Sequence, residues 1–241
     1  MDMLIRDQRM RRSAYAALCV CAIAFGWIES IAVVYLREVY SHLPMAPSSP
    51  WLDDFQITLV SLPGRLVSLE ELREACTIAV LAGAAWAAGR RPAERAGAFL
   101  LLFGVWDLTY YVALRAIAAW PDALGTWDVL FLIPAPWVAP VWAPMSVASI
   151  FVAIGTYLFW TPDRPRHYRV HDAAVLAGAV ALTLAAFLFD PSAPAEHRIP
   201  EHFPAELFST GIALGIGWFF VAEHRATVLT GRSDGASPRV L

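Results

Sequence analysis

The sequence predicts an all-α protein, a polytopic bundle of six transmembrane helices in which prolines break the fourth span. Its composition is the first observation behind this class: 58% of the 241 residues are hydrophobic and only 16% are charged, whereas about 25% of residues are charged in soluble domains. The second is a series of apolar runs close to the ~20 residues that a helix needs to cross the hydrocarbon core. Such runs in series favour an integral membrane protein.

The apolar runs and the connections between them divide the chain into three parts. We expect a cytoplasmic segment over 1–12, a transmembrane domain over 13–229 and a disordered cytoplasmic tail over 230–241. Within the domain the six predicted spans are 13–36, 68–89, 97–119, 129–160, 172–189 and 204–222. The longest connection is the outer loop 40–67, whose short apolar stretch 55–62 is expected to lie at the interface or to cap the bundle.

Arginine sets the predicted orientation. All 18 basic residues are arginines, and they cluster before the first span, between the second and third, between the fourth and fifth, and after the sixth. Because basic residues are enriched on the cytoplasmic side of membranes, both termini are expected to be cytoplasmic. The lack of lysine and asparagine is typical of a GC-rich genome, and we expect a multi-pass protein of a bacterial inner membrane.

Prolines interrupt the fourth span, at Pro134, Pro136, Pro140 and Pro144. Proline removes a backbone donor and clashes with the preceding helical turn. We therefore predict a short half-helix near 127–133, a bend, and a full helix over 141–160. The broken part is interpreted either as a re-entrant element lining a cavity, because irregular backbone at membrane depth needs cover from protein or water, or as an interfacial loop rich in tryptophan.

Three carboxylates lie inside apolar spans: Glu29 in the first, Glu74 in the second and Asp107 in the third. An ionised side chain at the centre of a membrane helix costs about 2.5–3.5 kcal/mol on insertion scales, and such residues commonly mark functional sites. Counted along each helix at ~1.5 Å per residue, all three fall in the outer half or near the middle of the bilayer. They are the candidate catalytic residues.

Other polar and aromatic side chains are expected near these acids. Asp107, Tyr110 and Tyr111 share one face of a helix, since residues three and four apart are neighbours. The candidate substrate-binding residues are Tyr110, Tyr111, Arg115, Glu71, Asp128 and Trp106. Together with the three acids they predict a site that opens toward the outer face of the membrane.

Two structural interpretations stand beside this functional one. Glu70, Glu71 and Arg73 are typical of a charged helix start at the water boundary, where acids suit the positive end of the helix dipole. The buried acids also suit a structural lock between helices, with Arg73 and Arg115 as counter-ions, because buried ion pairs specify packing in some proteins.

Residue types exclude several cofactors. Without lysine the chain cannot form the Schiff base that retinal or pyridoxal phosphate requires. Its histidines lie outside the cores of the predicted spans, where the axial ligands of a membrane haem would be. A divalent metal is compatible with Glu29, Glu74 and Asp107, with His197 or His202 added. A net charge of −3 and arginines that follow topology give no support for nucleic acid as a partner.

Three functions fit this pattern, all with membrane lipid as the surroundings. The first is a membrane-embedded enzyme doing acid–base or carboxylate–metal chemistry on a small or lipid-like substrate, with Glu29 or Asp107 as the acid and Glu74 as its partner. The second is a non-catalytic subunit or assembly factor of a larger membrane complex, which the 10 tryptophans suit. The third is a proton- or cation-coupled transporter, which the apolar inner halves of the first three spans and the lack of internal repeats disfavour.

The predicted orientation is tested by reporter fusions. Green fluorescent protein fused after Leu241 should fluoresce, because it folds only in the cytoplasm, and alkaline phosphatase fused after Ala123 should be active, because that loop is expected outside. An active phosphatase at the C-terminus would contradict the orientation derived from arginine.

Overall fold

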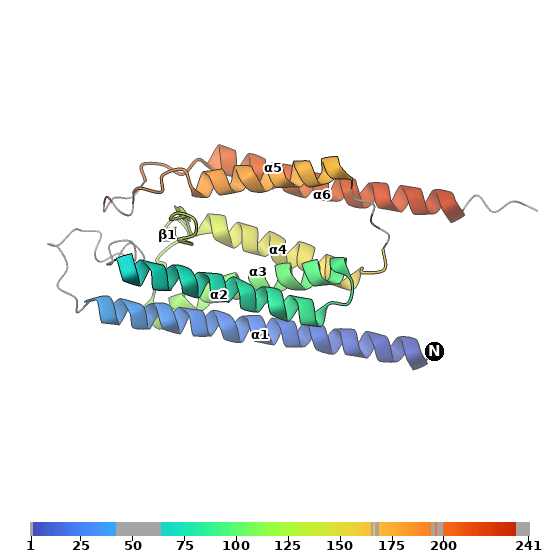
Figure 1. The fold of residues 1–241 in the computed structure, drawn as a ribbon, viewed down its shortest axis with the longest axis horizontal. Helices are drawn as coiled ribbons and strands as arrows, with labels where there is room; N and C mark the ends of the chain where they lie inside the picture. Colours follow the sequence, from blue (N-terminus) through green and yellow to red (C-terminus); the bar gives the residue numbers. More distant parts are fainter. Residues whose placement is uncertain are drawn as a thin grey trace, which may run out of the picture. The chain divides into compact units, whose positions relative to one another are not determined.

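The computed structural model describes residues 2–41, 64–164, 166, 169–193, 196 and 200–234 (Figure 1). The apolar stretch 55–62 and most of the predicted outer loop lie outside these residues, as does the tail from 235 onward. The described elements are α1 (Asp2–Ser41), α2 (Gly64–Ala88), α3 (Pro92–Ala118), β1 (Trp127–Val129), β2 (Val138–Pro140), α4 (Trp142–Trp160), α5 (Val170–Phe187) and α6 (Ala205–Asp234). The all-α class is confirmed apart from one small hairpin.

Five of the helices are long and apolar enough to cross a membrane: α1, α3, α4, α5 and α6. This is the pattern of a multi-pass membrane protein. The second predicted span forms α2, which is not among the five. The physical reason is its charge, because Glu70, Glu71, Arg73 and Glu74 fall within its first three turns.

The chain divides into two compact units. The first comprises Met1–Pro162 with Asp190–Glu201, and the second comprises Asp163–Phe189 with His202–Leu241. Helices α1 to α4 and the hairpin belong to the first unit, whereas α5 and α6 make up the second. All candidate catalytic and substrate-binding residues named above therefore lie in the first unit.

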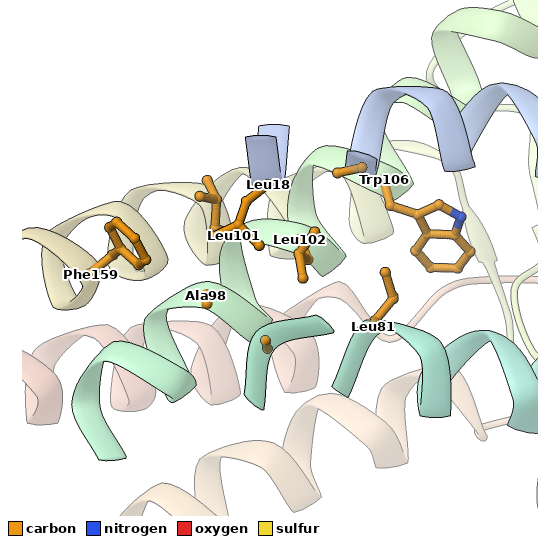
Figure 2. Packing of buried hydrophobic residues seen from close by; sticks show 9 residues of the cluster. Leu18, Leu81, Ala98, Leu101, Leu102, Trp106 and Phe159 are labelled. Carbon is orange, nitrogen blue, oxygen red and sulfur yellow. The ribbon is translucent and has the colours of Figure 1, made fainter. Parts of the chain in front are cut away.

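Helix α3 is the centre of the first unit and packs against α1, α2 and α4. Its buried residues Ala98, Leu101, Leu102 and Trp106 form a core with residues of these three neighbours (Figure 2). The neighbours contribute Leu18, Ala22, Leu81, Ala85 and Phe159. Small side chains and glycines allow helices to approach closely in membranes, where packing rather than the hydrophobic effect drives association.

Helices α3 and α4 approach each other closely at two glycines that face each other. A Cβ atom on Gly97 would lie 2.7 Å from the carbonyl oxygen of Gly155, and one on Gly155 would lie 2.7 Å from the carbonyl oxygen of Gly97. Two turns along α3, a Cβ atom on Gly104 would lie 2.5 Å from the carbonyl oxygen of Ala148. Since these neighbours are backbone atoms, a side chain at any of these positions forces the helices apart.

The predicted half-helix over 127–133 is wrong, because this segment forms the first arm of an antiparallel β-hairpin. Trp127 pairs with Pro140, Asp128 with Ala139 and Val129 with Val138. Beyond the strands, the Leu130 N–H donates to the Trp137 carbonyl at 2.8 Å. A hairpin accommodates the prolines better than a helix does, because only alternate backbone groups of each strand need a partner in the ladder. The helix predicted over 141–160 is present as α4 without a break.

The second unit is a hairpin of two helices joined by polar contacts at one end. Asp172 is fully buried and accepts hydrogen bonds from the Arg169 backbone N–H at 2.8 Å and the Trp218 indole at 2.9 Å. It also forms an ion pair with Arg225. Glu223 pairs with Arg166 at 2.8 Å. Each buried acid in this unit thus has a basic partner, as burial of a charge requires.

Glycine substitutions test the α3–α4 approach. Gly104→Ala should lower the free energy of unfolding in detergent by about 1–3 kcal/mol, because the added methyl group overpacks the interface. Gly83→Ala is the control, because a Cβ atom at Gly83 meets nothing within 4 Å, and it should raise stability by up to about 1 kcal/mol through the higher helix propensity of alanine. Thermal or denaturant unfolding measures both variants, and equal effects would contradict this packing.

Candidate functional site

The sequence-predicted site residues occupy four elements of the first unit. Glu29 lies on α1, Glu71 and Glu74 on α2, and Asp128 on β1, while α3 carries Trp106, Asp107, Tyr110, Tyr111 and Arg115. Glu29, Glu74 and Asp128 are buried, at 8%, 7% and 3% exposure.

Arg73 joins α2 to α1 through a triad of charges. Its guanidinium forms ion pairs with Glu29 on α1 and with Glu70 one turn earlier on α2. The Arg73 Nε atom donates to Glu70 Oε1 at 2.9 Å. Glu70 is 5% exposed, so two buried carboxylates share one arginine. Each acid thereby gains the charged partner that burial demands.

The Glu74 carboxylate is hydrogen-bonded to the hairpin rather than to Arg73. Both of its oxygens accept the backbone N–H of Leu132, at 3.1 and 2.9 Å. Leu132 lies in the connection between β1 and β2, outside the paired positions of the ladder. The carboxylate therefore satisfies a buried backbone donor that would otherwise lack a partner, and it fixes the hairpin to α2.

Asp128 and Tyr111 fix the same hairpin to α3. The Tyr111 hydroxyl donates to Asp128 Oδ2 at 2.7 Å, and Tyr111 is only 3% exposed. Its ring packs against Tyr110 and Trp120, with centroid distances of 5.1 and 6.3 Å. The two anchors, Glu74 and Asp128, hold the hairpin against two different helices.

Ser30 connects α1 to α3 beside the triad. Its hydroxyl lies 2.8 Å from the Gly26 carbonyl oxygen and 3.0 Å from the Tyr110 carbonyl oxygen. Arg73 also has electrostatic interactions with Glu74 and Tyr110. Residues of α1, α2 and α3 therefore meet in one layer, which we call the acidic layer and define as Glu29, Glu70, Arg73, Glu74, Asp107, Tyr110, Tyr111 and Asp128.

Asp107 differs from the other acids of this layer. It is half-buried, and among the residues that the structure describes it has no hydrogen bond or ion pair. It interacts electrostatically with Tyr111, one turn along α3. Asp107 is thus the carboxyl group of the layer that no structural contact occupies.

Trp106 lies next to Asp107 and is 5% exposed. Its indole Nε1 atom is buried and has no hydrogen-bond partner within the described residues. The ring packs against Phe25, Phe103 and Phe131, at centroid distances of 6.4, 5.3 and 6.5 Å. A buried N–H group without an acceptor costs free energy, so it calls for an explanation.

Arg115 takes no part in these contacts, and Glu71 interacts with the acidic layer electrostatically, through Glu74, without a hydrogen bond or ion pair among the described residues. Arg115 is exposed and donates to the carbonyl oxygens of Ala119 and Pro121, where it caps the end of its own helix. Its guanidinium lies 3.7 Å from Asp122. Glu71 is half-buried. Of the two expected counter-ions, only Arg73 serves the acidic layer.

The sequence did not predict which partner each buried acid binds. Glu70 was expected to mark a charged helix start, yet it is a buried member of the triad. Its spacing of three residues from Arg73 is the signal that finds the pair. No sequence signal points to the bond from Leu132 to Glu74, because it depends on how the hairpin folds.

The charges of the acidic layer do not balance. Five acids lie in it, Glu29, Glu70, Glu74, Asp107 and Asp128, against the single arginine Arg73. In surroundings of low dielectric such an excess has to be offset by protons on some carboxyls or by a bound cation. No group of three or more His, Cys, Asp or Glu side chains in the described part of the chain is placed to hold a metal ion. His197 lies outside the described residues, and His202 belongs to the second unit.

Comparisons with known proteins add no family. No protein-family model matches the chain, and neither a curated protein nor a solved structure matches it significantly.

The triad is tested by removing its arginine. Arg73→Ala should destabilise the protein by about 3 kcal/mol, at the lower end of the range for breaking a buried pair, because its side chain is 29% exposed. The triple variant Glu29→Met, Glu70→Met, Arg73→Met should recover most of this loss, since no unpaired charge remains. Arg65→Ala, at an exposed position of the same helix, is the control. Unfolding in detergent measures all three, and an unaffected Arg73→Ala variant would contradict the triad.

Proposed function

We propose that this chain is a multi-pass protein of a bacterial inner membrane, with both termini in the cytoplasm, and that its acidic layer is the site of a membrane-embedded enzyme. The reaction is acid–base chemistry on a small or lipid-like substrate. The observation that carries the proposal is Asp107, a carboxyl group without a hydrogen bond or ion pair among the residues that the structure describes, inside a layer whose other acids are held in place.

The proposal includes α2 as a sixth membrane span. Its charged turns are the obstacle, and the contacts described above reduce their cost: Glu70 is paired with Arg73, and Glu74 accepts a backbone N–H. The remainder of α2, from residue 75 to residue 88, carries no charged side chain. Polar groups that pair inside a bundle are the form in which membranes tolerate charge.

In this proposal the acids have different tasks. Glu29, paired with Arg73, and Glu74, bound to Leu132, are positioning residues that set the geometry of the layer. Asp107 is the proton donor or acceptor, because a carboxyl group without a fixed hydrogen bond can exchange its proton with a substrate. Tyr111 lies within its electrostatic reach and is itself oriented by Asp128. The excess of acids over arginine supports protonated carboxyls in the layer.

A second candidate is a non-catalytic subunit of a larger membrane complex. The same contacts support it if their role is structural. The four acids that make them all stabilise the packing of helices or of the hairpin: Glu29, Glu70, Glu74 and Asp128. In that case Asp107 takes no part in a reaction, and its substitution leaves the lipid and small-molecule composition of the cell unchanged.

The two candidates are separated by Asp107→Asn. Cells that produce the wild-type protein should differ from control cells in at least one lipid or small molecule, measured by untargeted mass spectrometry of membranes and medium. Asp107→Asn should abolish that difference at an unchanged folded yield, because no hydrogen bond is lost. Glu206→Gln, at an exposed position of α6, should behave as wild type.

An Asp107→Asn variant that keeps the wild-type difference would overturn the enzyme. Co-purification of the wild type and Asp107→Asn with the same larger complex, without any change in cell composition, would support the subunit.

A further inference from the structure

Trp106 supplies an unused hydrogen-bond donor at the edge of the acidic layer. Its side chain is more than nine-tenths buried, and its indole N–H has no acceptor in the part of the chain that the structure describes. By comparison, the Glu74 carboxylate is bound to the Leu132 N–H and the Tyr111 hydroxyl is bound to Asp128. A donor that folding leaves unsatisfied is explained if a bound molecule supplies the acceptor.

Trp106 lies one helical turn before Tyr110 on α3. In Figure 2 its indole nitrogen lies on the side of the ring away from Phe159. The Trp106 carbonyl lies beside Gly26 of α1, where a Cβ atom would be 2.8 Å from it. Glu29 follows Gly26 by three residues, a rise of about 4.5 Å along the helix. The backbone of Trp106 and the backbone of Glu29 are therefore separated by about one helical turn along the bundle.

Helix α2 and the hairpin connect Trp106 to Glu74. Leu81 belongs to one core cluster with Trp106, and Thr77 and Glu74 follow it along one face of α2, all three buried. Phe131, which packs on the Trp106 ring, is followed by Leu132, whose N–H is bound to Glu74. Trp106 on α3 and Glu74 on α2 are thus linked through the core cluster and through the hairpin.

The walls near Trp106 are aromatic and only partly buried. Phe25, Phe103 and Phe131 pack against the core cluster and are only partly buried. Aromatic rings that keep some exposed surface in an apolar helix bundle offer contact to a hydrocarbon chain that enters from the lipid, as apolar walls with a few polar groups do in ligand sites generally.

Electrostatics decides the charge of the ligand. The layer holds five acids and one arginine, and that arginine is already shared by Glu29 and Glu70. An anionic headgroup at this place would be repelled by nearby carboxylates and would find no unshared cation in the layer. A neutral oxygen accepts from the indole N–H without this penalty.

We infer that the site takes a neutral amphiphile whose polar end carries a hydroxyl or carbonyl oxygen, and that Trp106 Nε1 donates the hydrogen bond that holds this oxygen. The inference rests on the proposed function and names the substrate class of the same site. The oxygen lies between the indole and the acidic layer, and the hydrocarbon chain lies along Phe25, Phe103 and Phe131.

Three probes of equal chain length test the inference on the full-length protein in detergent: 1-dodecanol, dodecane and dodecanoate. The protein carries ¹⁵N in its indole groups, and the Trp106 resonance is assigned from its loss in Trp106→Phe. Dodecanol should shift this resonance to lower field in a saturable manner. Dodecane should not shift it, and dodecanoate should bind at least about tenfold more weakly.

Trp106→Phe keeps an aromatic ring and removes the N–H group, so it should weaken dodecanol binding about 5- to 10-fold. Trp86→Phe is the matched control, because Trp86 is 66% exposed, and it should leave the affinity unchanged. Equal shifts with dodecane, or no shift with dodecanol, would overturn the inference. Either outcome is read from the wild type, so the test survives a Trp106→Phe variant that does not fold.

Failure of the inference and failure of the proposed function are distinguishable. Asp107→Asn should bind dodecanol within about twofold of wild type, because the indole holds the ligand. If cells show no chemistry that depends on Asp107 while dodecanol binding depends on Trp106, the enzyme is wrong and the ligand class stands. If the chemistry depends on Asp107 but Trp106→Phe binds dodecanol as tightly as wild type, the ligand assignment is wrong.

Discussion

The first unit of this protein depends on one constraint, that a charge inside an apolar bundle must have a partner. Arg73 meets it for two acids at once, Glu29 on α1 and Glu70 on α2. Without the guanidinium, two buried carboxylates would face each other in surroundings of low dielectric, a cost of several kcal/mol. The contact also fixes the rotation of α2 about its axis, because only one face of the helix presents Glu70 and Arg73 to α1. The positions of Glu74 and of the residues it binds follow from that rotation.

The hairpin shows the same constraint applied to backbone groups. Its strands pair over only three residues each, which leaves donors in the connection without a ladder partner. Glu74 takes the Leu132 N–H, and Asp128 takes the Tyr111 hydroxyl. Glu74 on α2 thus holds the hairpin to α2, and Asp128 on β1 holds it to α3. A three-residue ladder would be marginal by itself, so the hairpin depends on these side chains.

Much of the fold could be predicted from the sequence because length and hydropathy decide it. The apolar runs that correspond to α1, α3, α4, α5 and α6 are long. Most of the predicted span ends lie within a few residues of the ends of the apolar helices in the structure. The segment 127–140 could not be predicted, since its prolines exclude a regular helix without saying which irregular structure replaces it. Burial of Glu29 and Glu74 followed from their positions inside apolar runs, whereas burial of Asp128 and the distribution of partners depend on contacts between residues far apart in the sequence. Arg115 illustrates this limit, because its place one turn from Tyr111 suggested a counter-ion and its side chain instead turns to the end of its own helix.

The bridge between α1 and α2 has a consequence for how the chain enters a membrane. A helix with Glu70, Glu71, Arg73 and Glu74 in its first three turns is a poor substrate for insertion by itself, because each isolated charge adds a cost of a few kcal/mol. Glu29 on the preceding helix supplies part of the compensation, but only if α1 is still beside α2 when α2 arrives. If α2 is a membrane span, as proposed above, the two helices are best released into lipid as a pair, and the order of synthesis, α1 before α2, provides the partner in time. Glu29 on α1 would then lower the cost of inserting α2, because it pairs with Arg73.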